Sequence, residues 1–177
     1  MKTYKLLTPG PLTTTDSVKQ EMLFDHCTWD EDYKQITQRI RRELLQLAHV
    51  DETAYTTVLM QGSGTFGVES VISSVIPDDG CLLLLSNGAY GERIAAMCRY
   101  HHISCVHIAQ DYDKIPDRMK AEEALKQHPE ITHIAMIHSE TTTGILNDIQ
   151  SIGELAKTYH KVFIVDAMSS FAGEIGR

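Results

Sequence analysis

The residue best placed to do chemistry is an acid that directly follows a buried strand. Val162–Val165 is short, apolar and rich in β-branched residues, which predicts a strand inside a parallel sheet. Asp166 comes next and should lie at the carboxyl edge of the sheet, where open α/β sheets bind ligands. A carboxylate there can pair with a protonated ring nitrogen, because unit charges about 4 Å apart attract by roughly 4 kcal/mol at an effective dielectric near 20. A turn or helix-capping role is the alternative.

A glycine-rich turn offers a second set of ligand groups. Ser63, Gly64 and Thr65 lie in Gln61-Gly-Ser-Gly-Thr-Phe-Gly, which follows a strand-like segment and precedes a predicted helix. Exposed amides and hydroxyls at a helix N-terminus bind phosphate. The turn contains G-x-G-x-x-G, but a dinucleotide site also needs an acid after the next strand, and that strand ends in Ser86-Asn-Gly. We therefore favour a single phosphate group, with an ordinary β–α turn as the alternative.

Two more polar segments should reach the same edge. Tyr90 follows the predicted strand Cys81–Leu85 and could stack on a bound ring, and Arg93, one turn later, could face a substrate anion or only solvent. Thr141 lies in a hydroxyl-rich run after the predicted strand Thr132–Ile137, where threonines also commonly cap turns. A phosphate loop, an aromatic ring, hydroxyls and an acid would together suit pyridoxal phosphate (PLP). The acid matters because the ring nitrogen of PLP must be protonated for the cofactor to act as an electron sink.

Hydrophobic periodicity and turn residues predict the elements that position these groups. We expect helices at Thr15 or Asp16 to Phe24, Asp32–His49, Thr65–Ile76, Ala89–Tyr100, Pro116–Gln127 and Ile149–Tyr159. We expect strands at Tyr55–Met60, Cys81–Leu85, Ile103–Ile108, Thr132–Ile137 and Val162–Val165. This alternation predicts an α/β fold with a mainly parallel sheet and helices on both faces.

Composition narrows the choice of partners. The 177 residues suit one domain, and a net charge of −8 with acids and bases mixed along the chain argues against nucleic acid or an anionic membrane as the partner. A small-molecule substrate is therefore expected. The four cysteines lack metal-like spacing, and the histidine spacing likewise predicts no metal site. Free thiols, and the lack of an apolar leader or membrane-length apolar run, favour a cytoplasmic protein.

Five motifs, taken in order, resemble those of the fold-type I PLP-dependent aminotransferases: Thr-Pro-Gly-Pro, Gly-Ser-Gly-Thr, Ser-Asn-Gly-Ala-Tyr-Gly, His-Ser-Glu-Thr-Thr-Thr-Gly and Val-Asp-Ala-Met-Ser-Ser-Phe. Within that family they are most similar to the 2-aminoethylphosphonate–pyruvate transaminases. The resemblance implies that Ser63–Thr65 binds the cofactor phosphate and that Tyr90 stacks on the pyridine ring. It also implies that Thr141 hydrogen-bonds near the phenolic oxygen and that Asp166 pairs with the ring nitrogen.

The resemblance further implies transfer of an amino group from 2-aminoethylphosphonate to pyruvate, giving phosphonoacetaldehyde and alanine, by a homodimer. In this family the Schiff-base lysine lies beyond the strand that follows Asp166, so we expect it past the end of this sequence; Lys157 and Lys161 precede the strand and are not substitutes. Ala172 stands where the family generally has glycine.

We interpret residues 1–177 as the N-terminal portion of the large PLP-binding domain, without the rest of that domain and the small C-terminal domain. Such a chain would be inactive alone, or would pair with a separately encoded C-terminal part. Two alternatives remain open at this point. One is an aminotransferase of the alanine– or serine–glyoxylate type, and the other is a non-catalytic PLP-binding remnant or partner subunit.

Overall fold

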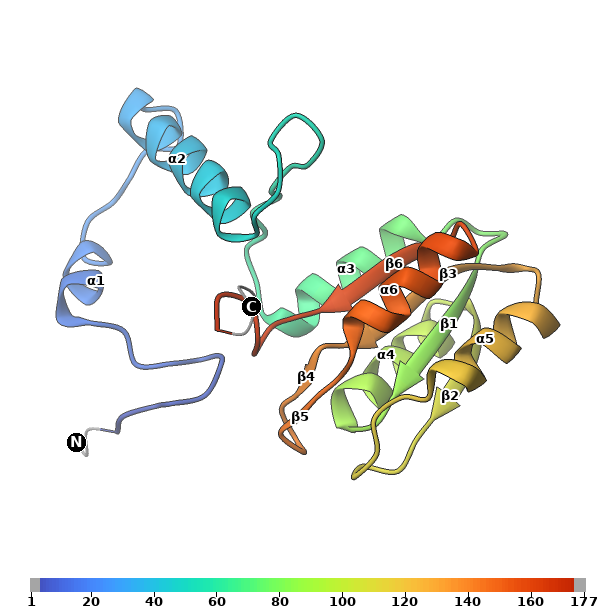
Figure 1. Ribbon diagram of the computed structural model, residues 1–177. Coiled ribbons are helices and arrows are strands. Elements are labelled where there is room, and N and C mark those ends of the chain that lie inside the picture. The colour runs from blue at the N-terminus through green and yellow to red at the C-terminus, as the bar shows by residue number, and fades with distance from the viewer. Residues whose placement is uncertain (1–3, 174–177) are drawn as a thin grey trace. The chain divides into compact units, whose positions relative to one another are not determined.

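The computed structural model describes residues 4–173, which form two compact units divided between Gln61 and Gly62 (Figure 1). None of the helices in the described part of the chain is long and apolar enough to cross a membrane. The cysteines, all four of which lie in the described residues, are free thiols, as the sequence predicts: Cys27, Cys81, Cys98 and Cys105.

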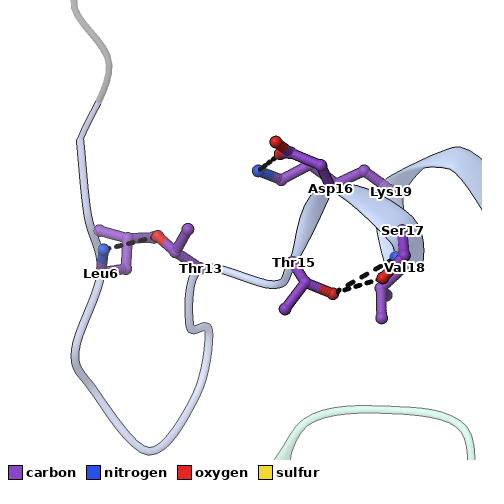
Figure 2. A network of polar contacts seen from close by, with 7 residues as sticks. All are labelled: Leu6, Thr13, Thr15, Asp16, Ser17, Val18 and Lys19. Carbon is purple, nitrogen blue, oxygen red and sulfur yellow. Dashed lines mark hydrogen bonds and ion pairs between the residues drawn. The ribbon is translucent and has the colours of Figure 1, made fainter.

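The described residues of the first unit form two helices, α1 (Asp16–Glu21) and α2 (Glu31–Leu47). Figure 2 shows how its first residues are held: the Leu6 amide donates to Thr13 Oγ1 at 2.7 Å, and Thr15 caps α1 by accepting from the Val18 amide. Helix α1 ends three residues before the predicted end at Phe24, because the chain turns at Met22. None of the described residues before Gly62 is buried, so this unit has no core of its own.

The predicted strand Tyr55–Met60 is wrong, since this segment forms no strand. Its β-branched residues favour extended backbone, but a strand also needs a neighbouring strand to pair with its amides and carbonyls. Here Arg41 of α2 takes that place: its Nε donates to the Thr57 carbonyl and its Nη2 to Thr56 Oγ1, both at 2.9 Å. The segment is therefore anchored to a helix instead of a sheet.

The second unit contains a four-stranded parallel sheet in the order β2-β1-β3-β6. Its strands are β1 (Cys81–Ser86), β2 (Ser104–Ala109), β3 (Ile131–Ile137) and β6 (Val162–Asp166). Its helices are α3 (Gly64–Val75), α4 (Ala89–Tyr100), α5 (Arg118–Gln127) and α6 (Ile149–Thr158). A two-stranded antiparallel hairpin, β4 (Ser139–Glu140) and β5 (Ile145–Leu146), follows β3 and was not predicted, because two-residue strands leave no periodic signal.

Helices cover both faces of this sheet, as predicted (Figure 1). Strand β1 is buried along its whole length, and its leucines alternate between two cores. Leu83 and Leu85 pack with residues of α5 and α6, whereas Leu82 and Leu84 pack with residues of α3 and α4. The predicted α/β fold is therefore confirmed, and each strand residue can be assigned to one of two faces.

Candidate functional site

Asp166 is the last residue of β6, at the carboxyl edge of the sheet, where the sequence places it. It pairs in register with Ile137, which packs in the core under α3 and α4. Ile164, two residues earlier on β6, packs against that same core. Because side chains alternate along a strand, the Asp166 carboxylate is directed to the face that α3 and α4 cover.

The backbone around Asp166 is fixed on both sides. Its Oδ1 accepts a hydrogen bond from the Met168 amide at 3.0 Å, and its carbonyl accepts from the His138 amide at 2.8 Å. The carboxyl group is thus held by a short turn that continues into the loop after β6. His138 is itself buried, and its Nδ1 has no hydrogen-bond partner among the described residues.

The loop after β6 lies directly against the glycine-rich turn. A Cβ atom on Gly64 would lie 3.3 Å from Met168 Sδ and 3.5 Å from Met168 Cε, so a side chain at position 64 would press on this loop. The structure therefore brings together the Ser63–Thr65 turn and the segment that follows Asp166. They are about one hundred residues apart in the sequence, and only the folding of α3 onto the sheet makes them neighbours.

The glycine-rich turn has the form of an anion-binding helix N-terminus. Ser63 is the N-cap of α3 and accepts from the Phe66 amide at 3.2 Å. Gly62 has a φ of 151°, and a Cβ there would lie 2.6 Å from the Phe66 ring, so this position requires glycine. By position, the amides of Gly64 and Thr65 precede the first intrahelical hydrogen bonds of α3 and are those that a helix start offers to an anion.

Helix α4 contributes an aromatic ring and a cation to this region. Arg93 Nη1 donates to Thr65 Oγ1 at 2.9 Å, and the Arg93 guanidinium lies 5.0 Å from the centre of the Tyr90 ring. Tyr90 keeps 37% of its surface exposed. One arginine thus connects the Ser63–Thr65 turn to the candidate stacking ring, and places a positive charge beside the candidate phosphate site.

The hairpin after β3 holds the hydroxyl-rich run. Thr141 is exposed in the turn between β4 and β5. Its neighbour Thr142 makes the contact to helix α4, because Thr142 Oγ1 accepts from the Ala89 amide at 3.3 Å. The structure therefore places the Thr141 turn next to the start of α4, the helix that carries Tyr90.

Sequence reasoning missed Glu140, a fully buried acid in this hairpin. Its Oε1 accepts from Thr142 Oγ1 at 2.7 Å and from the Thr142 amide at 3.3 Å, and its Oε2 accepts from the Gly91 amide at 3.4 Å. No ion pair within the described residues involves it. An acid in a threonine-rich turn is normally exposed to solvent, so the residues around Glu140 do not indicate its burial. The only indication in the sequence is the pair of glycines, Gly88 and Gly91, on either side of Tyr90.

Nearby groups offset the free-energy cost of burying the Glu140 carboxylate. Removing a carboxylate from water costs several kcal/mol even after relaxation. Here it lies at the N-terminus of α4, where the helix dipole contributes up to about 2 kcal/mol in partly buried geometry. Each hydrogen bond to a charged group adds about 1.5–3 kcal/mol. Glu140 is thus satisfied only while the hairpin and the start of α4 stay together.

Two further polar networks hold the ends of the strands. The side-chain amides of Asn87 and Asn147 are buried and bond to each other reciprocally, at 2.8 and 3.0 Å. At the end of β1, Ser86 Oγ lies 2.7 Å from His107 Nε2 and donates to Glu92 Oε1 at 3.0 Å. These contacts fix the first turn of α4 relative to the sheet. No cluster of three or more metal-ligating side chains lies in residues 4–173.

Comparison with known proteins agrees with this architecture. The sequence profile of the aminotransferase class-V family matches residues 26–174, and the chain belongs to this family. Membership implies PLP as the cofactor. The chain is 57% identical over 173 residues to a 2-aminoethylphosphonate–pyruvate transaminase of Lysinibacillus sphaericus, covering 98% of this chain and 47% of the relative. It is 55% identical over 170 residues to the enzyme of that name from Bacillus cytotoxicus, covering 96% and 47%.

Solved structures show the same fold. A pyridoxamine–pyruvate aminotransferase of Mesorhizobium loti superposes with a TM-score of 0.82 at 26% identity, covering 95% of this chain and 42% of that one. An alanine–glyoxylate aminotransferase of a Nostoc species gives a TM-score of 0.85 at 22% identity, covering 97% and 45%. The chain thus spans about half the length of the relatives that it matches.

Proposed function

We propose that this chain is the N-terminal portion of the PLP-binding domain of a 2-aminoethylphosphonate–pyruvate transaminase. The complete enzyme would move the amino group of 2-aminoethylphosphonate to pyruvate, giving phosphonoacetaldehyde and alanine. The identity of 55–57% to two proteins of that name supports this substrate pair over the alanine– or serine–glyoxylate alternative. A non-catalytic remnant would have no need to keep both the buried Glu140 network and an anion-binding turn.

The residues of the site fit PLP in their chemistry. Ser63, Gly64 and Thr65 would hold its phosphate, because they supply helix-start amides and hydroxyls. Arg93, bonded to Thr65, is better placed to neutralise this phosphate than to reach a substrate, so we assign it to the cofactor in place of the substrate role expected from the sequence. When bound, the cofactor supplies an electron sink for the amino-group transfer.

The remaining side chains would orient the ring. Tyr90 would stack on its face, using the exposed part of its own ring, and Thr141 would donate to the phenolic oxygen from the hairpin turn. The Asp166 carboxylate would accept the proton of the ring nitrogen and hold it there. An attraction of roughly 4 kcal/mol corresponds to about three pK units, enough to keep a pyridine nitrogen protonated at neutral pH.

The rest of the catalytic machinery would come from residues outside this chain. We propose that these supply the catalytic lysine and the small domain, either in a longer protein or as a separately encoded part. A homodimer is also proposed, as the resemblance to the fold-type I aminotransferases implies. A cytoplasmic location remains a prediction from the sequence.

The contact between Gly64 and the loop after Asp166 is the observation that carries the cofactor site. The test is to titrate the chain with pyridoxamine phosphate, the amino form of the cofactor, which does not react with surface lysines. At one hundred times the dissociation constant, binding should stabilise the fold by about 2.7 kcal/mol, whereas pyridoxamine without the phosphate should bind far more weakly. Equal binding of both compounds, or of neither, would refute the phosphate site.

The substrate assignment has its own test. The chain would be combined with the C-terminal half of the Lysinibacillus sphaericus relative, and alanine formation from pyruvate would be measured with 2-aminoethylphosphonate as amino donor. Glyoxylate with alanine or serine is the matched control. Faster transfer to glyoxylate would replace the proposed substrate pair with the alternative one.

A further inference from the structure

The buried Glu140 carboxylate joins two separate parts of the candidate site. We propose that Glu140 is a positioning residue that holds the start of α4, with Tyr90, and the Thr141 turn in one fixed arrangement for the cofactor. This inference rests on the proposed PLP site. It concerns a residue that would act through the segments it holds, because each of its two oxygens accepts from a different segment.

The contacts of Glu140 divide between the two segments. Oε1 accepts from the hydroxyl and the amide of Thr142, the residue directly after Thr141. Oε2 accepts from the amide of Gly91, the residue directly after Tyr90. A displacement of either segment would leave one oxygen of this buried carboxylate without its donor, and the penalty for that is larger than for the loss of an exposed contact.

Shape reinforces this coupling. Gly88, two residues before Tyr90, lies so close to Glu140 that a Cβ there would be 2.2 Å from Glu140 Cγ. Gly91 likewise lies over Ser86, with a distance of 2.4 Å between its ideal Cβ and Ser86 Cβ. The backbone on both sides of Tyr90 is therefore closely packed. This fixes the position of the Tyr90 backbone from which the ring extends, as a stacking side chain requires.

A carboxylate is required here because both neighbours are donors. A glutamine at position 140 has the same shape, but it offers one acceptor oxygen and one amide nitrogen that donates. Either the Gly91 amide or the Thr142 amide would then face another donor. Glu140→Gln should thus break one of the two links while it leaves the volume of the core unchanged.

The experiment compares Glu140→Gln with a control matched in stability. Leu125→Ala removes a buried side chain on the α5 and α6 face, and Ile152→Val on that face is a milder choice if the losses must be matched more closely. Three quantities are measured for each variant. They are the dissociation constant and induced circular dichroism of pyridoxamine phosphate, and the amide hydrogen exchange of residues 88–92 and 140–144.

For Glu140→Gln we expect about tenfold weaker cofactor binding, a reduced circular dichroism signal, and about tenfold faster exchange in both segments. The control variant should bind the cofactor as the unaltered chain does, despite an equal loss of melting temperature. Unchanged binding and exchange in Glu140→Gln, or an equal effect of the control, would overturn the inference. If the unaltered chain binds no cofactor, the proposed function fails, while coupled exchange of the two segments still decides the role of Glu140.

Discussion

Substitution of Gly88 by alanine should destabilise this fold more than a single methyl group would suggest. The new Cβ would lie 2.2, 2.4 and 2.8 Å from Glu140 Cγ, Cδ and Oε2. Gly88 has a φ of −179°, an extended conformation that alanine also adopts, so the effect is steric and involves no backbone strain. Glu140 is fully buried and bonded to both Thr142 and Gly91, so it can move only by giving up hydrogen bonds.

The expected size follows from these contacts. Overpacking a core costs about 1–3 kcal/mol, and losing one hydrogen bond to a charged group costs about 1.5–3 kcal/mol. A combined loss near 3 kcal/mol would lower the melting temperature by roughly 6–12 °C for a chain of this size. Thermal unfolding followed by circular dichroism, with denaturant titration as a second measure, is the assay.

Gly67→Ala is the matched control for Gly88→Ala. A Cβ at Gly67, inside α3, meets nothing within 4 Å, so alanine there should be neutral or stabilise the chain by up to about 1 kcal/mol through helix propensity. The double variant Gly88→Ala with Glu140→Ala should lose less stability than the two single losses added together, because the second change vacates the space that the first one needs. A Gly88→Ala chain as stable as the unaltered one would refute the packing of Glu140 against α4.

Three other predictions concern stability. Asp148→Ala should cost about 1 kcal/mol of unfolding free energy at neutral pH, because Asp148 caps α6. The Ser151 amide lowers the pKa of Asp148, so this contribution is present above pH 3.8 and is lost as the pH falls through the folded-state pKa. An equal loss of stability at neutral and at strongly acidic pH would contradict this prediction. Burial lowers the pKa of His133, so the unfolding free energy of the unaltered chain should decrease as the pH falls below about 6.5. Denaturant titration of His133→Gln at the same pH values should show a shallower decrease. The same dependence on pH in both chains would count against this prediction. Asn147→Leu should cost about 1–3 kcal/mol in unfolding free energy, because it leaves the buried Asn87 Oδ1 without its donor, while Asn87 Nδ2 keeps the Lys114 carbonyl. A neutral effect would show that Asn87 Oδ1 finds another donor.

Regular elements of the second unit were well predicted from the sequence. Helix α4 has the predicted bounds, and strands β1, β3 and β6 begin or end within one residue of theirs. These elements could be predicted because their own local sequence patterns determine their structure. Strand β1 is apolar along its length, and α6 begins at a side-chain cap. Parallel strands then place all carboxyl ends at one edge, which is why Asp166 lies where it was expected.

Features that depend on long-range partners could not be predicted. Residues 55–60 have a strand-like composition, but Arg41 binds Thr56 and Thr57, and no pattern within the segment indicates that. Glu140 is buried only because the start of α4, about fifty residues earlier, supplies a donor and the space beside Gly88. Likewise, Arg93 was expected to face a substrate anion or solvent, and its bond to Thr65 depends on how α3 packs against α4.

The most direct test of the cofactor site is the protonation of the bound ring nitrogen. Pyridoxamine phosphate labelled isotopically at that nitrogen would be bound to the unaltered chain and to Asp166→Asn, and its nitrogen NMR signal would be followed against pH. If Asp166 pairs with the ring nitrogen, that nitrogen should stay protonated at neutral pH in the unaltered chain and lose its proton in the variant. The same titration curve in both proteins would mean that Asp166 does not face the ring.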